Sequence, residues 1–173
     1  MLQRKVCDPA HPLEWPVSRA AETMWAGMGY QSMVELYLQT RKKPHILVAD
    51  SEPGIPTLVS FALSPHFEMV GAVYDGDAAI LATVGIKPDV LILDLILPGL
   101  SSLEVIRRVT GGDPRLKVIV LTALDDRVSA TKALEAGASG FVVKRRMKID
   151  LPVAIRQVLS GKTFVSAGSD NTL

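Results

Sequence analysis

Four side chains that could take part in phosphoryl transfer each stand at the end of a short apolar run of the sequence. They are Asp50 after 45–49, Asp94 after 90–93, Thr122 after 117–121 and Lys144 after 140–143. A carboxylate can attack phosphorus and form an acyl phosphate, provided that nearby groups offset the negative charge of the donor. A carboxylate-bound magnesium ion, an ammonium group and a hydroxyl suit that task. If the four residues converge, Asp94 is the expected nucleophile.

Convergence requires a parallel sheet, and the hydrophobic pattern from residue 45 onward predicts one. Strands are expected at 45–49, 67–74, 90–93, 117–121 and 140–143. Between these runs, apolar residues recur at helical spacing, as Ile55, Leu58, Val59 and Ala62 do. A last helix is expected over 151–159, with Pro152 in its first turn. Five βα units joined by right-handed crossovers place the carboxyl ends of the strands at one edge.

Composition limits the classes of protein that fit. The 173 residues are 48% hydrophobic, which suffices for one well-buried domain. Lys plus Arg number 19 and Asp plus Glu number 18, so no global charge favours nucleic acid or an anionic membrane. One cysteine, Cys7, excludes an internal disulfide framework. With no signal-peptide core and no apolar run of about 18 residues, we expect a cytoplasmic protein without a membrane partner.

The pattern divides the chain into three expected segments. Residues 1–43 form an N-terminal extension that is partly helical or disordered, residues 44–162 form the α/β domain, and residues 163–173 form a flexible tail. In the extension, Ala21, Met24, Trp25 and Met28 share one helical face. Two interpretations stay open: a helix that packs on its own domain, or an interaction helix for a partner or a second copy.

Several segments of the α/β domain resemble the receiver family of response regulators, the phospho-acceptor modules of two-component signalling. They are ILVAD (46–50), PDVLILDLILPG (88–99), VIVLTA (118–123) and EAGASGFVVK (135–144). The resemblance covers about 44–162 and implies a flavodoxin-like, doubly wound α/β fold with a five-stranded parallel sheet in order 2-1-3-4-5. The stretch 135–144 and the GKTFVS ending at 161–166 are similar to the subfamily that usually adds a C-terminal helix-turn-helix domain, which this sequence does not contain.

By this resemblance, Asp94 accepts a phosphoryl group from a histidine kinase or a phosphotransfer protein, and Lys144 binds the phosphate. Asp50, Asp94 and the main-chain carbonyl of Ile96 would hold Mg²⁺. Such a module catalyses its own phosphoryl transfer without being a turnover enzyme.

The resemblance also implies a conformational switch. Thr122 is the switch hydroxyl and Phe141 is the aromatic switch position: the phosphate draws Thr122 inward and Phe141 follows. The expected output is protein–protein contact or a homodimer, with transcription as the regulated process. DNA binding is expected only through a partner or if an output domain was removed.

The residue after Asp50 departs from the family pattern, which usually has two adjacent acidic residues where this chain has Asp50 and Ser51. Two unit charges 4 Å apart interact by about 4 kcal/mol at an effective dielectric constant of 20, so the loss of one carboxylate weakens metal binding. Glu52 either substitutes for it or is solvated. We therefore expect weak or absent magnesium binding. The alternative function is a receiver-like scaffold or dimerisation module that is not phosphorylated.

Two apolar residues flank the expected acceptor where many receivers have polar ones. Ile96 lies two residues after Asp94 and Leu124 lies two residues after Thr122. Apolar side chains there would screen an acyl phosphate from water, so we expect a long-lived phosphate. The family also favours glycine near Ser102, which suggests a different loop path after Gly99.

Overall fold

The computed structural model describes residues 43–166, and residues 1–42 and 167–173 lie outside the described part. The helical face expected around Met24 and the tail expected after Ser166 therefore lie outside the described residues and stay predictions.

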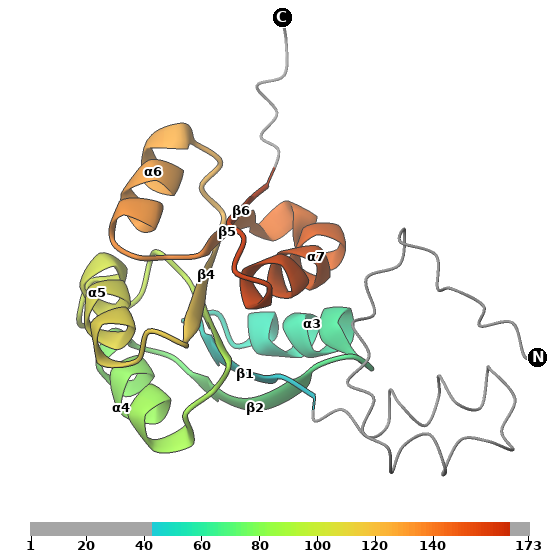
Figure 1. Cartoon of the computed structure of the whole chain (residues 1–173), viewed down its shortest axis with the longest axis horizontal. Coiled ribbons are helices and arrows are strands. Elements are labelled where there is room, and N and C mark those ends of the chain that lie inside the picture. Colours follow the sequence, from blue (N-terminus) through green and yellow to red (C-terminus); the bar gives the residue numbers. More distant parts are fainter. Residues whose placement is uncertain (1–42, 167–173) are drawn as a thin grey trace, which may run out of the picture. The chain divides into compact units, whose positions relative to one another are not determined.

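The described residues form a parallel sheet in the order β2-β1-β3-β4-β5-β6 (Figure 1). The strands are β1 His45–Ala49, β2 Glu68–Val73, β3 Val90–Leu93, β4 Lys117–Thr122, β5 Gly140–Val143 and β6 Phe164–Val165. All five neighbouring pairs run parallel, and β1 lies between β2 and β3. Because the order reverses at β1, the loops after β1 and β3 leave the sheet edge side by side, which is where doubly wound sheets bind ligands.

Helices cover both faces of this sheet. They are α3 Gly54–Leu63, α4 Gly76–Ile86, α5 Ser102–Gly112, α6 Arg127–Glu135, the 3₁₀ turn η1 Lys144–Arg146, and α7 Met147–Leu159. Figure 1 shows α3 and α7 on one face of the sheet and α4, α5 and α6 on the other. No helix of the described region is long and apolar enough to cross a bilayer.

Alternate strand residues build two cores, because successive side chains of a strand point to opposite faces. Leu91, Leu93 and Phe141 contribute to the core on the α4, α5 and α6 side. Val90 and Ile92 contribute to the core on the α3 and α7 side. The central strands are therefore apolar on both faces, which explains their unbroken hydrophobic runs.

Side-chain caps fix where three of the helices begin, close to the carboxyl edge of the sheet. Asp75 accepts a hydrogen bond from the Ala78 amide at the start of α4, and Asp126 accepts one from the Ser129 amide at the start of α6. The Ser101 side chain caps α5 in the same way. Each cap satisfies an amide that has no partner within its helix.

The sequence prediction missed β6 and part of α7. Ser166 donates its main-chain N–H to Phe141 O at 2.8 Å, and Phe164 donates to Ser139 O at 3.2 Å. The domain thus has six strands instead of five, and the chain at 164–166, expected to be flexible tail, is ordered on the sheet. The helix α7 begins at Met147, four residues before the predicted start, so Pro152 lies inside it. Proline is disfavoured in helix interiors, which is why the pattern suggested a later start.

Candidate phosphoryl-transfer site

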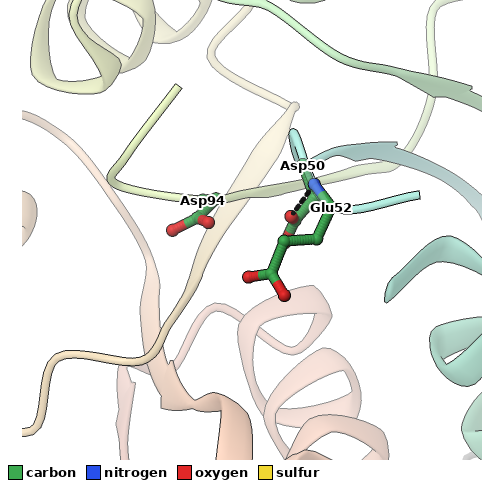
Figure 2. A group of neighbouring side chains, drawn as sticks. All are labelled: Asp50, Glu52 and Asp94. Atoms are coloured by element: carbon green, nitrogen blue, oxygen red, sulfur yellow. Dashed lines mark hydrogen bonds between the residues drawn. The ribbon is translucent and has the colours of Figure 1, made fainter. Parts of the chain in front are cut away.

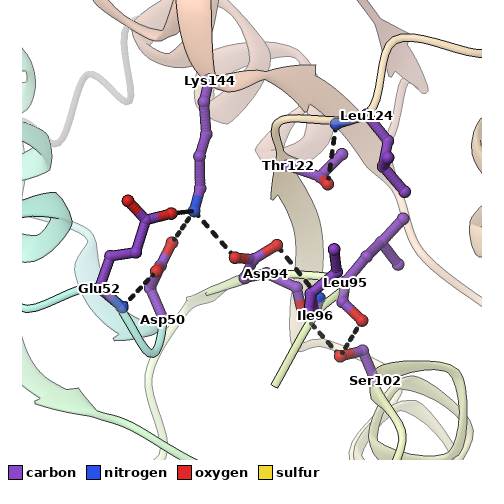
Figure 3. A network of polar contacts seen from close by, with 9 residues as sticks. All are labelled: Asp50, Glu52, Asp94, Leu95, Ile96, Ser102, Thr122, Leu124 and Lys144. Carbon is purple, nitrogen blue, oxygen red and sulfur yellow. Dashed lines mark hydrogen bonds and ion pairs between the residues drawn. The ribbon is translucent and has the colours of Figure 1, made fainter. Parts of the chain in front are cut away.

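The carboxyl edge of the sheet brings together three of the residues that the sequence singled out. Asp50 follows β1, Asp94 follows β3 and Lys144 follows β5 as the first residue of η1. Both aspartates are buried, with 1% and 5% of their surface exposed. Figure 3 shows the three side chains pointing toward one another from three strands.

The ammonium group of Lys144 is the centre of this cluster. Its Nζ lies 2.8 Å from Asp94 Oδ2, 2.9 Å from Asp50 Oδ2 and 2.7 Å from Glu52 Oε1. The contacts to Asp94 and Glu52 have hydrogen-bond geometry. The Asp50 contact is an ion pair, and Asp50 Oδ2 is buried without a hydrogen-bond partner among the described residues.

The pKa values of Asp50 and Lys144 are both raised, for different reasons. Burial is the main reason that the pKa of Asp50 is raised, and the neighbouring charge of Asp94 adds to it. The Glu52 amide and Lys144 oppose this rise. Burial alone would lower the pKa of Lys144, but the hydrogen bonds to Asp94 and Glu52 outweigh it and raise that pKa. The carboxylates around Lys144 therefore favour its charged form.

Asp94 is held by its backbone as well as by Lys144. Its main-chain N–H donates to Ala49 O at 2.9 Å, which continues the pairing of β1 and β3. Its Oδ1 accepts a hydrogen bond from the Ile96 amide at 3.2 Å. The buried hydroxyl of Ser102 donates to Asp94 O at 2.6 Å and to Leu95 O at 3.0 Å (Figure 3).

Ser102 is thus a positioning residue that the sequence reasoning did not recognise. The family pattern suggested only a different loop path here, and no motif marks a serine that bonds to carbonyls seven and eight residues earlier.

Gly99 has the left-handed φ of 76°, and a side chain there would meet Asp77 Oδ2 at 2.9 Å. Glycine is therefore favoured at this turn.

Glu52 joins the cluster while most of its side chain stays exposed to solvent. Its main-chain N–H donates to Asp50 Oδ1 at 2.9 Å, and its side chain reaches Lys144 although 64% of that side chain is exposed. Carboxylate oxygens of Asp50, Glu52 and Asp94 lie within 4.8 Å of one another. Figure 2 shows the three acidic side chains grouped in this way. Ser51, by contrast, is exposed.

The acidic group has the chemistry of a divalent-cation site. Its ligands are hard carboxylate oxygens, and Asp50 Oδ2 is a buried oxygen without a hydrogen-bond partner in the described region. The residues present therefore fit the magnesium ion that receiver domains typically bind. Lys144 contacts all three carboxylates, so an entering cation would compete with it.

Thr122 and Phe141 lie on the neighbouring strands β4 and β5. Thr122 is the fully buried last residue of β4, and its Oγ1 accepts a hydrogen bond from the Leu124 amide at 3.2 Å. Phe141 is only 2% exposed and belongs to the core on the α4, α5 and α6 side. The ring is already inside in this structure, so the expected inward movement of Phe141 stays a prediction.

The two apolar residues beside the acceptor are only partly covered. Ile96 is 64% exposed and Leu124 is 40% exposed. Figure 3 shows both near Asp94, with Ile96 and Leu95 on the loop after β3 and Leu124 after β4. The shielding expected from the sequence therefore depends on side chains at the rim of the site and not on a closed pocket.

This chain is similar in sequence and structure to known proteins. Residues 46–156 match the model of the response regulator receiver domain. The response regulator GacA of Pseudomonas aeruginosa is 29% identical over 123 residues, covering 70% of this chain and 58% of GacA. The oxygen regulatory protein NreC of Staphylococcus epidermidis is 33% identical over 123 residues, covering 69% of this chain and 56% of NreC. The chain thus spans little more than half the length of these relatives.

Solved structures agree with the sequence matches. The signal receiver domain of the response regulator NarL from Mycobacterium tuberculosis is 28% identical with a TM-score of 0.66, and the match covers 70% of this chain and all of that one. The isolated receiver domain of RcsB from Salmonella enterica serovar Typhimurium was solved with the phosphomimetic BeF₃⁻. It is 26% identical with a TM-score of 0.66, and the match covers 72% of this chain and 94% of that one. The family model matches more than half of the chain and the solved receiver structures share its fold, so the chain belongs to the response regulator receiver family.

Proposed function

We propose that this receiver accepts a phosphoryl group on Asp94 from a histidine kinase or a phosphotransfer protein. A carboxylate oxygen of Asp94 attacks the phosphorus of the donor's phosphohistidine, the P–N bond breaks, and the imidazole leaves with the bonding electron pair. The product is an acyl phosphate on Asp94. The observation that carries the proposal is the 2.8 Å contact between the buried Asp94 carboxylate and Lys144 Nζ.

Lys144 has two tasks in this reaction. Before transfer it stabilises the buried carboxylate, which would otherwise be costly to hold as an anion. After transfer, the same ammonium group can follow the new charge and bind the phosphoryl oxygens. Its exposed fraction is only 11%, so it acts where water screens the charge weakly.

A divalent cation would be held by Asp50, Asp94 and the main-chain carbonyl of Ile96, with Glu52 near enough to take part. Such an ion neutralises charge on the donor and orients it. We expect weak binding, because Ser51 brings no carboxylate and Lys144 already neutralises part of the charge. Lys144 and the Ile96 amide hold the Asp94 carboxylate in place.

The proposed output is a population shift that reaches the surface of β4, β5 and α6. A phosphoryl group on Asp94 would draw Thr122 toward it and break the hydrogen bond from the Leu124 amide. That change favours protein–protein contact or a homodimer. RcsB, one of the structural relatives, has been solved as two dimers bound to two parallel DNAs. Transcription regulation by this chain would need a partner or a further domain.

Intact-mass measurement after incubation with acetyl phosphate and Mg²⁺ tests the proposal. The wild type should gain the mass of one phosphoryl group, and Asp94→Asn should gain none. Asp89→Asn is the matched control, because Asp89 stands at the other end of β3 and is exposed. This variant should gain mass like the wild type. No gain in the wild type, with acetyl phosphate or with a cognate kinase, would overturn the proposal.

One observation favours a second candidate function, a scaffold or dimerisation module that is not phosphorylated. Ser51 is exposed and has no charge, so the usual pair of acidic residues is incomplete. In that case, the Lys144 cluster would be a purely structural ion-pair network. The same mass measurement separates the two functions, because a scaffold gains no mass.

A further inference from the structure

The geometry points to Glu52 as the third carboxylate of a divalent-cation site. It would take the role that an acidic residue at position 51 ordinarily has, and on binding the ion its carboxylate would leave Lys144. This inference deepens the proposed function at the same site. It concerns cation binding by the unphosphorylated protein, so it can be tested without phosphoryl transfer.

The turn after β1 directs Glu52 toward the site. Asp50 Oδ1 accepts the hydrogen bond from the Glu52 main-chain N–H at 2.9 Å, which folds the chain back over the end of the strand. Pro53 then adopts a helical φ of −60° before α3. This turn leaves Ser51 exposed and brings Glu52 Oε1 to 2.7 Å from Lys144 Nζ.

A buried oxygen in the cluster has an ion pair as its only partner among the described residues. Asp50 is 1% exposed, and its Oδ2 has no hydrogen bond in the described part of the chain, only the ion pair with Lys144. Buried carboxylate oxygens are stable when paired and hydrogen-bonded or bound to a metal. Carboxylate oxygens of Glu52 and Asp94 lie within 4.8 Å of those of Asp50, so one ion can reach all three residues.

The charges of the cluster call for a divalent ion. Three carboxylates face one ammonium group, which leaves two negative charges uncompensated in a site whose two aspartates are buried. A single divalent cation neutralises that excess. Hard, doubly charged ions with oxygen ligands, such as Mg²⁺ and Mn²⁺, have the matching chemistry.

Glu52 is also the carboxylate that is free to move. Its side chain is 64% exposed, whereas those of Asp50 and Asp94 are 1% and 7% exposed. It can therefore turn from Lys144 to an ion without unpacking the core, while the two aspartates stay in place. Lys144, released from Glu52, remains in contact with Asp94.

Electron paramagnetic resonance of free Mn²⁺ measures the binding directly during titration of the unphosphorylated protein. Glu52→Gln keeps the shape of the side chain and removes its charge, and it should weaken Mn²⁺ binding by about tenfold or more. Glu135→Gln is the matched control, since Glu135 is an exposed glutamate at the end of α6. It should bind within twofold of the wild type. Ser51→Asp added to Glu52→Gln should restore binding, because it returns the third carboxylate at the usual position.

The outcomes separate this inference from the proposed function. Equal Mn²⁺ affinity of the wild type and Glu52→Gln, or no binding by the wild type at millimolar Mn²⁺, would overturn the assignment of Glu52. A phosphoryl mass gain on Asp94 together with either of those results would leave the proposed function intact. Mn²⁺ binding that depends on Glu52, without any mass gain, would support the cation site and reject phosphorylation.

Discussion

The hydroxyl of Ser102 donates a hydrogen bond to the main-chain carbonyl of Asp94 at 2.6 Å. Ser102 is the first residue of α5 and is 2% exposed, so this bond ties the loop that carries Asp94 to the helix after it. The same hydroxyl also donates to Leu95 O at 3.0 Å. One side chain therefore fixes the backbone from which the proposed nucleophile projects.

Ser102→Ala should lower the free energy of unfolding by about 1–3 kcal/mol, because two carbonyls lose their donor at a buried position. Urea denaturation measures the change. Ser60→Ala, at an exposed position of α3, is the control and should change stability by no more than about 0.5 kcal/mol. Equal effects of the two substitutions would show that the Ser102 bonds do not stabilise the loop.

Lys144→Met should destabilise the protein by about 3 kcal/mol at neutral pH, because it leaves three carboxylates without their shared cation. Added Mn²⁺ should then raise the urea midpoint of the variant more than that of the wild type, since the ion no longer competes with Lys144. Lys162→Met, at an exposed position after α7, should leave both quantities near the wild-type values. A Mn²⁺ response of Lys144→Met no larger than that of the wild type would contradict the competition.

Asp150 should make stability depend on pH in the acid range. Arg146 donates hydrogen bonds to both of its carboxylate oxygens, at 2.8 and 3.0 Å, and Ser166 Oγ donates to it at 2.6 Å. The Arg146 bonds are the main reason that the pKa of Asp150 is lowered. Because the folded state holds this proton more weakly than the unfolded chain, the stabilisation is present above the unfolded pKa of about 4 and is lost as pH falls through the lowered value.

Asp150→Asn should therefore cost about 1–3 kcal/mol at pH 7, and its difference from the wild type should shrink as the pH falls below about 4. Urea midpoints measured between pH 7 and pH 3 follow both effects. Asp113→Asn is the control: the pKa of Asp113 is also lowered, chiefly by Arg115, but the pair is exposed and should contribute little. A difference between wild type and Asp150→Asn that stays constant over this pH range would rule out the ion pair as its source.

The apolar side chains of Ile96 and Leu124 should prolong the life of a phosphoryl group on Asp94. On the proposed function, Ile96→Asn and Leu124→Asn should each speed hydrolysis several-fold, because polar side chains admit and orient water at the rim. Val128→Asn, at an exposed apolar position of α6, should have no effect. Phosphoprotein decay followed by intact mass gives the half-lives. A wild-type half-life of seconds would show that neither side chain protects the phosphate.

Strand runs and helical spacing predicted most of the fold because they depend on local patterns. The two-residue strand β6 is too short to show a period, and its pairing with β5 is set by Ser166 and Phe141 from different parts of the chain. The start of α7 was misplaced because Pro152 resembles a first-turn proline. These misses come from tertiary contacts that override local preference.

The sequence predicted the site residues that directly follow strands. It did not predict the positions of side chains that depend on the path of a loop or turn. Asp50, Asp94 and Lys144 converge because parallel strands end at one edge. The position of Glu52 depends on the turn that its amide forms with Asp50, and that of Ser102 on the path of the loop after β3. Neither turn has a sequence signal specific enough to fix the direction of a side chain.

Chemical trapping of the acyl phosphate tests the central claim most directly. Borohydride reduces an acyl phosphate of aspartate to homoserine, and peptide mass spectrometry then identifies the residue that was converted. After incubation with acetyl phosphate and a divalent cation, we predict homoserine at position 94 and unmodified aspartate at position 50. Homoserine at another position, or an unmodified Asp94 in protein that has been exposed to its cognate kinase, would contradict the account.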